Sequence, residues 1–464
     1  MVENFLQHFE KIVWGAPLLA LLLASGVYLT FVSRFVQVRY LFYSLKLAFS
    51  RNQDLGAASR GNISHFEALM TALAATIGIG SVAGVATAIA IGGLGALFWL
   101  WIAAFLGMAT KYSEAILALR YRVTSEDGEL SGGPMYYLEK GFRSKRSGRV
   151  LAVFFAMAGA VAAFGTGNMV QAHAVSSSLF SCFSLSPWFS GLFLCAITAC
   201  ALFGGIKSIG KVSSYLVPLM AVLYVGGGLC VLFLQRDQIP DALAKIVKTA
   251  FTGQAATGGF LGSTLLLAVQ YGVSRGIFSS EAGMGSAPIA AAAAKSDVPG
   301  RQALVSMSGV FITSFLVCTV TGLAIATSGV LGQVDSQGAL LSGSRLVIEA
   351  FNTALPGSGV VITLSLLLFA YSTILGWAYY GEKCVEYLFG QKSILVYRLI
   401  FVAALLPGSL VSLSVVWSFA NIMNGVMAIP NLLGLFALSS VVAEETRSLS
   451  LLLRQEAYQE RSYP

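Results

Sequence analysis

The chain has 464 residues, of which 56% are hydrophobic and only 11% are charged, and its formal net charge is +8. Soluble domains carry about 25% charged residues, and a soluble fold of this composition would expose much apolar surface to water. The composition therefore excludes a soluble enzyme and indicates a membrane protein, and it does not indicate a nucleic-acid binder because the positive charges lie in loops between apolar runs.

Eleven apolar runs are long enough to cross a membrane, which takes about 20 residues in a helix. None alternates with period two as the strands of a membrane barrel would, so each is predicted to be a helix. In chain order they are 14–33, 68–91, 95–119, 150–178, 188–205, 212–234, 256–291, 303–331, 357–380, 394–416 and 419–442.

The loop charges predict the orientation of these helices. With the N-terminus outside, the loops and tail assigned to the cytoplasm hold 21 of the 29 Lys and Arg residues, and the outside segments hold five. Cytoplasmic loops of membrane proteins are enriched in Lys and Arg. We therefore expect a multi-pass protein of the inner (plasma) membrane with its N-terminus outside and its C-terminus in the cytoplasm.

The segments divide into a leading helix (14–33), two sets of five (68–234 and 256–442) and a cytoplasmic tail (443–464), all within one membrane domain. Because five is odd, the second set enters the membrane from the opposite side to the first. This is the arrangement of transporters built from inverted repeats, in which the first helix of each repeat is often broken at mid-membrane.

Each set does begin with a Gly-rich interruption: TIGIGSVAG at 76–84 and RGIFSSEAGMGS at 275–286. Glycine inside a helix costs about 1 kcal/mol relative to alanine, so matched clusters suggest a purpose. Unwound backbone exposes helix N-termini to anions and carbonyls to cations. Gly78 and Gly283 are therefore candidates for a gating or structural role, although glycines such as Gly80 could also serve close helix packing.

Glu281 is the charge that stands out, because it lies in an apolar run beside the second interruption. An ionisable residue at this depth is costly and is a functional candidate. It could bind a cation, carry a proton or cap unwound backbone. The structural alternative is a carboxylate that pairs with Arg275 or caps the second half of the helix.

Polar residues gather in two further segments. Asn168 and Gln171 in the fourth can hydrogen-bond an amino or carboxyl group, or can simply join helices. Ser372 and Thr373 in the ninth can bind their own backbone or, through oxygen, a hard cation such as sodium. Trp377 lies four residues after Thr373 on the same helix face, where a small apolar side chain could rest against its indole.

Other charged residues are assigned outside the site. Lys111 and Glu114 are expected to pair with each other at the membrane interface, and Glu382 and Lys383 to close the ninth helix. Residues 205–212 are predicted to form a short cytoplasmic turn. The cysteines and histidines show no spacing typical of a transition-metal site, and no cofactor is expected.

Several of these stretches together resemble the alanine/glycine:cation symporter family, also called the sodium:alanine symporters. The likeness spans nearly the whole chain in order. Its motifs are residues 71–88, FWLWIAAFLGMATKYSE at 98–114, GGPMYYLEKG at 132–141, residues 164–171, RGIFSSEAGMGSAP at 275–288 and STILGWAYYGEKCVEYLFG at 372–390.

The resemblance implies an all-α, leucine-transporter-like fold and cation-driven uptake of small neutral amino acids such as alanine and glycine. The substrate carboxylate would lie against the backbone of Ile79 and Gly80. The residues around its amino group and side chain would be Ser81, Gln171, Phe278, Thr373 and Trp377. The sodium ligands would be carbonyls near Ala74 and Ile77 and the hydroxyls of Ser372 and Thr373.

The chain departs from the family pattern at Ile79, Ser81 and Ser280, where the usual residues include two amide side chains. A hydroxyl reaches less far than an amide, so selectivity or ion coupling could differ. We therefore expect a sodium-coupled symporter rather than an enzyme, with no nucleic-acid partner and no obligate protein partner. The alternatives are proton coupling through Glu281, a channel and a non-transporting nutrient sensor.

Overall fold

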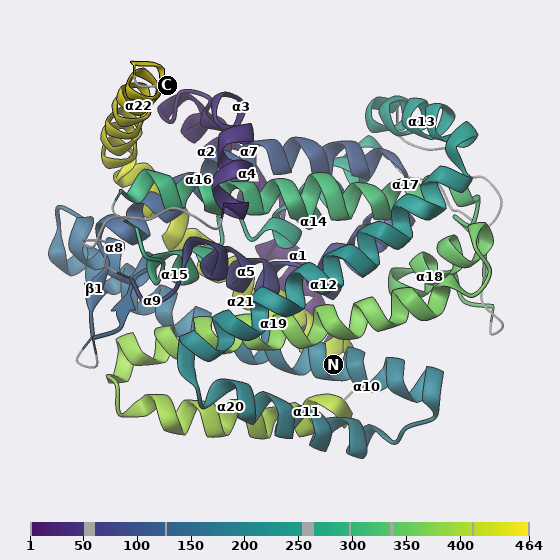
Figure 1. Cartoon of the computed structure of the whole chain (residues 1–464). Coiled ribbons are helices and arrows are strands. Elements are labelled where there is room, and N and C mark those ends of the chain that lie inside the picture. Colours follow the sequence, from purple (N-terminus) through teal and green to yellow (C-terminus); the bar gives the residue numbers. More distant parts are fainter. Residues whose placement is uncertain are drawn as a thin grey trace.

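The computed structural model describes residues 2–50, 61–125, 128–252, 264–296, 298–334, 338–410 and 413–462. Nearly all of the secondary structure in this part of the chain is helical, and the long helices run in roughly the same direction across Figure 1. A short antiparallel hairpin joins β1 (Val123–Thr124) to β2 (Leu130–Ser131). The architecture agrees with the predicted all-α membrane fold.

The helices follow the predicted order. The leading part forms α1 (Val2–Val13), α2 (Ala16–Val32), α3 (Val36–Arg39) and α4 (Leu41–Phe49). The first set contains α5 (His65–Thr76), α6 (Ile79–Gly92), α7 (Gly95–Arg120), α8 (Pro134–Gly141), α9 (Lys145–Phe164), η1 (Gly165–Met169), α10 (Val170–Phe183), α11 (Pro187–Leu202) and α12 (Gly205–Leu234). The second set contains α14 (Leu265–Ser280), α15 (Ala287–Ala292), α16 (Pro299–Val310), η3 (Phe311–Val317), α17 (Cys318–Ser328), α18 (Gly343–Ala354), α19 (Ser358–Phe389), α20 (Ser393–Leu410) and α21 (Leu413–Ala437). The elements η2 (Arg236–Gln238) and α13 (Ile239–Thr252) connect the two sets, and α22 (Ser439–Ser462) forms the tail.

Eight of the described helices are long and apolar enough to cross a membrane, or nine if the bent pair α5 and α6 is one span. Of the other two predicted segments, 188–205 corresponds to α11, which is apolar but has 16 residues. The segment 256–291 contains α14 and α15, and its first residues, 256–263, lie outside the described part. The count of eleven spans therefore stays a prediction.

The connecting elements lie at two opposite ends of the bundle (Figure 1). β1, α8 and α22, from connections predicted to be cytoplasmic, lie at the left, and α13 and α18, from connections predicted to be outside, lie at the right. Three predicted spans separate α8 from α13, and three separate α18 from α22, so each pair is expected at opposite ends. Which end faces the cytoplasm and where the two repeats begin and end stay predictions.

The first break separates α5 from α6 by a bend of 42°. α5 begins with a capping box, in which Ser64 and Glu67 exchange side-chain and backbone hydrogen bonds. Beyond its end, Gly78 is extended (φ −115°, ψ −167°), and α6 starts at Ile79. The break is narrower than the predicted stretch 76–84, because the later glycines lie inside a helix that is buried along most of its length.

The second break follows the end of α14 at Ser280. Glu281 (φ +54°), Gly283 (φ +87°) and Gly285 (φ +82°) all have left-handed backbone, which cannot continue a right-handed helix. A Cβ atom added at either glycine would lie 2.6 Å from a neighbouring side chain, so packing as well as backbone geometry requires glycine there. The break is shorter than the predicted 275–286, since its first six residues are helical.

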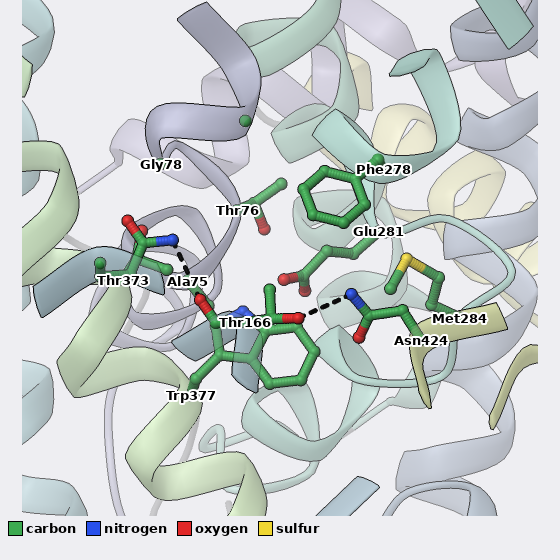
Figure 2. Close-up of a pocket in the computed structure, with 12 residues that line it drawn as sticks. Ala75, Thr76, Gly78, Thr166, Phe278, Glu281, Met284, Thr373, Trp377 and Asn424 are labelled. Atoms are coloured by element: carbon green, nitrogen blue, oxygen red, sulfur yellow. Dashed lines mark hydrogen bonds between the residues drawn. The ribbon is translucent and has the colours of Figure 1, made fainter. Parts of the chain in front are cut away.

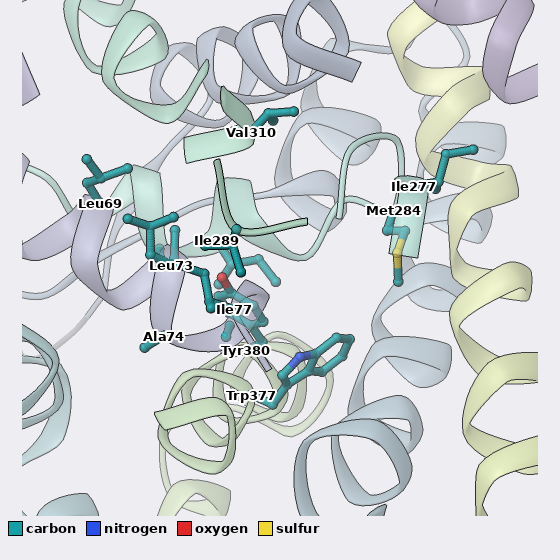
Figure 3. Close-up of a cluster of buried hydrophobic side chains, with 14 of the residues drawn as sticks. Leu69, Leu73, Ala74, Ile77, Ile277, Met284, Ile289, Val310, Trp377 and Tyr380 are labelled. Carbon is teal, nitrogen blue, oxygen red and sulfur yellow. The ribbon is translucent and has the colours of Figure 1, made fainter. Parts of the chain in front are cut away.

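The buried core brings the two breaks together (Figure 3). α14 packs against both α6 and α7, and α19 packs against α5. Ile77 of the first break, Met284 of the second and Trp377 of α19 belong to the same hydrophobic cluster. The core thus places two interruptions that are about two hundred residues apart in the sequence against one scaffold.

Two predictions about connections were wrong. Residues 205–212, expected to be a turn, form the first turns of α12 after a turn at 203–204. Glu382 and Lys383 do not close their helix, because α19 continues to Phe389. Both errors have one cause: charged side chains were taken as helix ends, whereas here Lys383 stays inside the helix, bound to Glu386 at 2.8 Å.

Candidate substrate and cation site

A small cavity lies where the two breaks meet α19 (Figure 2). Its volume is about 20 Å³, room for roughly one water molecule. Its walls come from the two breaks, from η1 and α10, and from α19 and α21. The lining residues are Ala75, Thr76, Gly78, Gly80, Thr166, Gln171, Phe278, Glu281, Met284, Thr373, Trp377 and Asn424.

Most of the residues singled out in the sequence meet at this cavity. Five of the seven predicted to contact the substrate line it, namely Gly80, Gln171, Phe278, Thr373 and Trp377. Gly78 and Glu281, candidates for a gating or structural role, line it too. The third such candidate, Gly283, follows Glu281 by two residues in the second break and does not line the cavity. Their roles as ligands stay predictions.

The other two predicted substrate residues, Ile79 and Ser81, do not line the cavity. The Ser81 hydroxyl donates to the Thr76 carbonyl at 3.0 Å and so braces the first break. The Ser81 N–H donates to the carbonyl of Gly78, the N-cap residue of α6, at 3.0 Å. Ile77, whose carbonyl is a predicted cation ligand, lies between the end of α5 and the N-cap of α6.

The other oxygens predicted to bind a cation converge beside the cavity. The hydroxyls of Ser372 and Thr373 on α19 each donate to the carbonyl of Ala74 on α5 at 3.2 Å. Each also lies 2.9 Å from the carbonyl of Phe369. Hard cations prefer oxygen ligands, and a hydroxyl whose hydrogen turns away offers its lone pairs. The chemistry of this group fits a sodium ion.

Glu281 points into the cavity from the second break (Figure 2). Its Oε2 accepts a hydrogen bond from Ser286, the N-cap residue of α15, at 2.9 Å, and the Trp377 indole interacts with the same carboxylate. The alternative pairing with Arg275 was wrong. The Arg275 guanidinium lies over the ring of Phe278, 5.7 Å from its centroid.

The expected pairing of Lys111 with Glu114 was also wrong, because both charges bind the second break instead. The Lys111 ammonium donates to the Ser280 carbonyl at 2.6 Å. The Glu114 carboxylate accepts from the N–H groups of Gly283 and Gly285, each at 3.1 Å. Sequence reasoning left both outside the site. The rule applied to Glu281, that an ionisable residue in an apolar run is functional, would have found them.

Replacing Glu114 by alanine should destabilise the protein strongly. The change leaves the N–H groups of Gly283 and Gly285, and the Asn431 amide that donates at 2.6 Å, without their acceptor. Buried donors left unpaired cost about 1–3 kcal/mol each. We expect a clearly lower unfolding temperature in a thermal scan of the detergent-purified protein. The control is Asp237→Ala, a side chain 95% exposed; equal midpoints for the two variants would contradict this role of Glu114.

Sequence reasoning also missed Thr166 and Asn424. The Asn424 amide donates to the Thr166 hydroxyl at 2.8 Å, and Gln171 donates to the Thr166 carbonyl at 3.0 Å. Asn168, considered beside Gln171, points elsewhere and donates to the Phe401 carbonyl at 2.6 Å. The sequence held one signal, because Asn424 is an amide in an apolar run. The structure adds that Thr166 lies in the π-helix η1, a feature frequent at functional sites.

A second, larger cavity lies on the other side of Phe278, which lines both. Its volume is about 260 Å³. Trp417 packs against the Phe278 ring, with 6.3 Å between the ring centroids. The lining residues are Glu10, Lys11, Trp14, Thr87, Ile91, Gln270, Tyr271, Ser274, Arg275, Phe278, Trp417 and Asn421. Phe278 therefore stands between the small cavity and a wider space that lies towards the predicted outer side.

The end of α15 is tied down on the opposite side. The Arg122 guanidinium donates to the carbonyls of Ala292, Ala294 and Ser296 at 2.9 to 3.3 Å. Backbone hydrogen bonds also link the segment around Ile63 to residues 293–295. These contacts satisfy the carbonyls at the helix end and hold the second broken helix to the start of the first.

Comparison with known proteins identifies relatives along the whole chain. The profile described as the Sodium:alanine symporter family matches residues 1–461. The sodium/alanine symporter AgcS of Methanococcus maripaludis is 50% identical over 451 residues, which cover 97% of each chain. The probable sodium/glutamine symporter GlnT of Bacillus subtilis is 37% identical and covers 95% of this chain and 90% of its own.

Two solved structures share the fold. MhsT in complex with L-phenylalanine superimposes with a TM-score of 0.57 at 15% identity, over 84% of this chain and 96% of its own. A Na⁺-coupled sialic acid symporter gives 0.58 at 14% identity, over 91% and 87%. These likenesses confirm the predicted leucine-transporter-like fold. The chain is a multi-pass membrane transporter, and it belongs to the sodium:alanine symporter family.

Proposed function

We propose that this protein couples sodium influx to the uptake of small neutral amino acids, alanine and glycine first, by alternating access. The observation that carries the proposal is that Thr373 belongs both to the substrate cavity and to the predicted cation site. Its side chain lines the small cavity, and its hydroxyl meets Ser372 at the Ala74 carbonyl. A cation held by these oxygens would touch the substrate cavity, so each ligand would favour binding of the other.

The cavity suits a small zwitterion. The first turn of α6, which includes Ile79 and Gly80, presents N–H groups that have no partner within the helix, and such groups bind carboxylates well. Phe278, Met284 and Trp377 offer apolar walls for a methyl group. At about 20 Å³ the space must widen even for alanine, which disfavours large side chains.

The departures from the family pattern leave the cavity wall intact. Ile79, Ser81 and Ser280 are all buried, yet none of them lines the cavity. The Ser280 hydroxyl instead lies 3.3 Å from the Ile277 carbonyl of its own helix. This placement supports the family's substrate class for this chain. It argues against the alternative in which these three residues abolish transport and leave a nutrient sensor.

The two sides of the small cavity differ, and the difference supports alternating access. Phe278 alone is shared with the wider outer cavity, whereas Arg122 and the backbone around Ile63 tie the inner end of α15. We propose plasma-membrane placement with the N-terminus outside and the C-terminus in the cytoplasm, so that the wide cavity faces outwards. Transport needs no chemical step and no cofactor beyond the co-transported ion.

The second candidate is proton-coupled symport, and Glu281 is the observation that favours it. A buried carboxylate that lines the cavity could carry a proton with the substrate. We place the sodium proposal first because three of the four predicted oxygen ligands, those of Ala74, Ser372 and Thr373, lie within hydrogen-bond distance of one another, and none of them is titratable.

Equilibrium binding to the purified protein tests the proposal. We expect the alanine affinity to rise with sodium concentration, and the sodium affinity to rise with alanine by the same factor, about 5- to 150-fold. Choline in place of sodium should give only weak binding. Alanine affinity that does not depend on sodium concentration but changes with pH would favour the proton alternative. Absence of alanine binding in both sodium and choline would contradict amino-acid symport.

Replacing Met284 by alanine should widen the choice of substrates. Met284 lines the cavity from the second break, so its truncation adds space beside the substrate side chain. We expect leucine or methionine to compete with labelled alanine about tenfold better than in the unchanged protein. The control is Met307→Ala, a fully buried methionine that does not line the cavity; an equal gain in that variant would contradict the assignment.

A further inference from the structure

We infer that Glu281 is the counter-charge for the substrate's ammonium group, and that it is the residue by which the protein distinguishes amino acids from carboxylates that lack an amine. The inference rests on the proposed function and adds to it the recognition of one end of the substrate. Of the twelve residues that line the small cavity, Glu281 is the one with an ionisable side chain. Figure 2 shows its carboxylate between the Phe278 ring and the Trp377 indole.

The cavity has two electrostatic poles. The N-terminus of α6 supplies partial positive charge near Gly78 and Gly80. In its ionised form, Glu281 supplies a full negative charge on the wall formed by the second break. A zwitterionic amino acid satisfies both poles at once, whereas a simple carboxylate would place a second negative charge beside Glu281 without compensation.

The carboxylate is held in place rather than free to turn. The left-handed backbone of Glu281 (φ +54°) directs the side chain away from the helix path, and the Ser286 hydroxyl binds Oε2 at 2.9 Å. Lys111 fixes the preceding residue through the Ser280 carbonyl, and Glu114 fixes the loop that follows. Lys111 and Glu114 are thus positioning residues, which act on the substrate through Glu281.

The charges around Glu281 leave room for one more positive group. Lys111 faces it from α7 and also interacts with Glu114, and the Tyr380 hydroxyl faces it from α19. When Lys111, Glu114 and Glu281 are all ionised, one ammonium and two carboxylates sum to a single negative charge. A buried uncompensated charge is costly, so an arriving ammonium would relieve this cost and gain a charge-assisted hydrogen bond. A role limited to capping α15 through Ser286 would give no such preference for an amine.

The test measures selectivity rather than activity alone. Binding of alanine and of propionate, which has the same carbon chain and carboxylate but no amine, is titrated at saturating sodium by calorimetry. The unchanged protein should bind alanine and bind propionate at least about tenfold more weakly. Glu281→Gln should weaken alanine binding about ten- to a hundredfold and largely remove the difference between the two ligands.

Ser286→Ala is the matched control, because it removes the hydrogen bond to Glu281 but keeps the charge. It should preserve the preference for alanine over propionate. The inference is overturned if Glu281→Gln prefers alanine over propionate as strongly as the unchanged protein does. It is also overturned if Glu281→Gln keeps its alanine affinity and loses only the pH dependence of transport. If Glu281→Gln does not fold, the unchanged protein decides the question. A ratio of alanine affinity to propionate affinity below about ten would overturn the inference.

The two proposals fail in different ways. If the unchanged protein binds no alanine, the proposed function itself is wrong. If it binds alanine with sodium dependence but does not use Glu281 to select the amine, only the present inference is wrong.

Discussion

Replacing Thr373 by valine should weaken the binding of both sodium and alanine. Valine keeps the shape of threonine but removes the hydroxyl that meets Ala74 at 3.2 Å and lines the cavity. An added Cβ at Gly78 would lie only 2.6 Å from this hydroxyl, so the group packs directly against the first break. We expect both apparent affinities to fall at least about tenfold, through the lost ligand and the lost linkage.

The matched control is Thr363→Val on the same helix. The Thr363 hydroxyl donates at 2.9 Å to the carbonyl of Gly359, one turn back in α19, and does not reach the breaks. Both affinities should stay close to those of the unchanged protein. The assignment fails if Thr373→Val binds sodium and alanine normally. A variant that loses alanine but keeps sodium affinity would confine Thr373 to the substrate cavity.

Replacing Gly167 by alanine should close the substrate cavity. A Cβ at this position in η1 would lie 1.9 Å from Cβ and 2.5 Å from Cγ of Trp377, so either the π-helix or the indole must move. Overpacking of this kind costs about 1–3 kcal/mol, and here the displaced group is a cavity wall. We expect alanine affinity to fall more than about tenfold, with a lower unfolding temperature.

Gly226→Ala provides the comparison, because a Cβ added at that glycine of α12 meets no atom within 4 Å. This variant should bind alanine normally, and its stability should be unchanged or about 0.5–1 kcal/mol higher, since alanine favours a helix. Normal alanine binding by Gly167→Ala would show that the contact between η1 and Trp377 does not shape the cavity. Equal loss in both variants would point to a general effect of added bulk.

The sequence predicted the parts of the fold that depend on composition and local chemistry. Apolar run length predicted where the helices lie, and paired Gly-rich stretches predicted the two breaks. The backbone now explains the second break, because left-handed residues such as Gly283 and Gly285 stop a helix wherever they occur. The placement of Ser372 and Thr373 near Ala74 was implied by the family resemblance, and the hydrogen bonds place these three residues together.

What could not be predicted depends on tertiary contacts. Lys111 and Glu114 are three residues apart, a spacing that fits a local ion pair as well as two separate bonds to a distant loop. Only the position of the second break beside α7 decides between the two. Asn424 meets Thr166 across 258 residues of sequence, which no local pattern can encode. Helix ends were missed where paired or exposed charges extend a helix beyond its apolar part, as at the start of α12.

The central claim is that an ion gradient drives amino-acid uptake through the cavity between the two breaks. The most direct measurement is accumulation of labelled L-alanine in proteoliposomes of the purified protein, with an inward sodium gradient and with choline in its place. The account predicts accumulation above the external concentration only with the sodium gradient, and loss of this accumulation in Thr373→Val. Accumulation that persists in choline, or no uptake under either a sodium or a proton gradient, would contradict it.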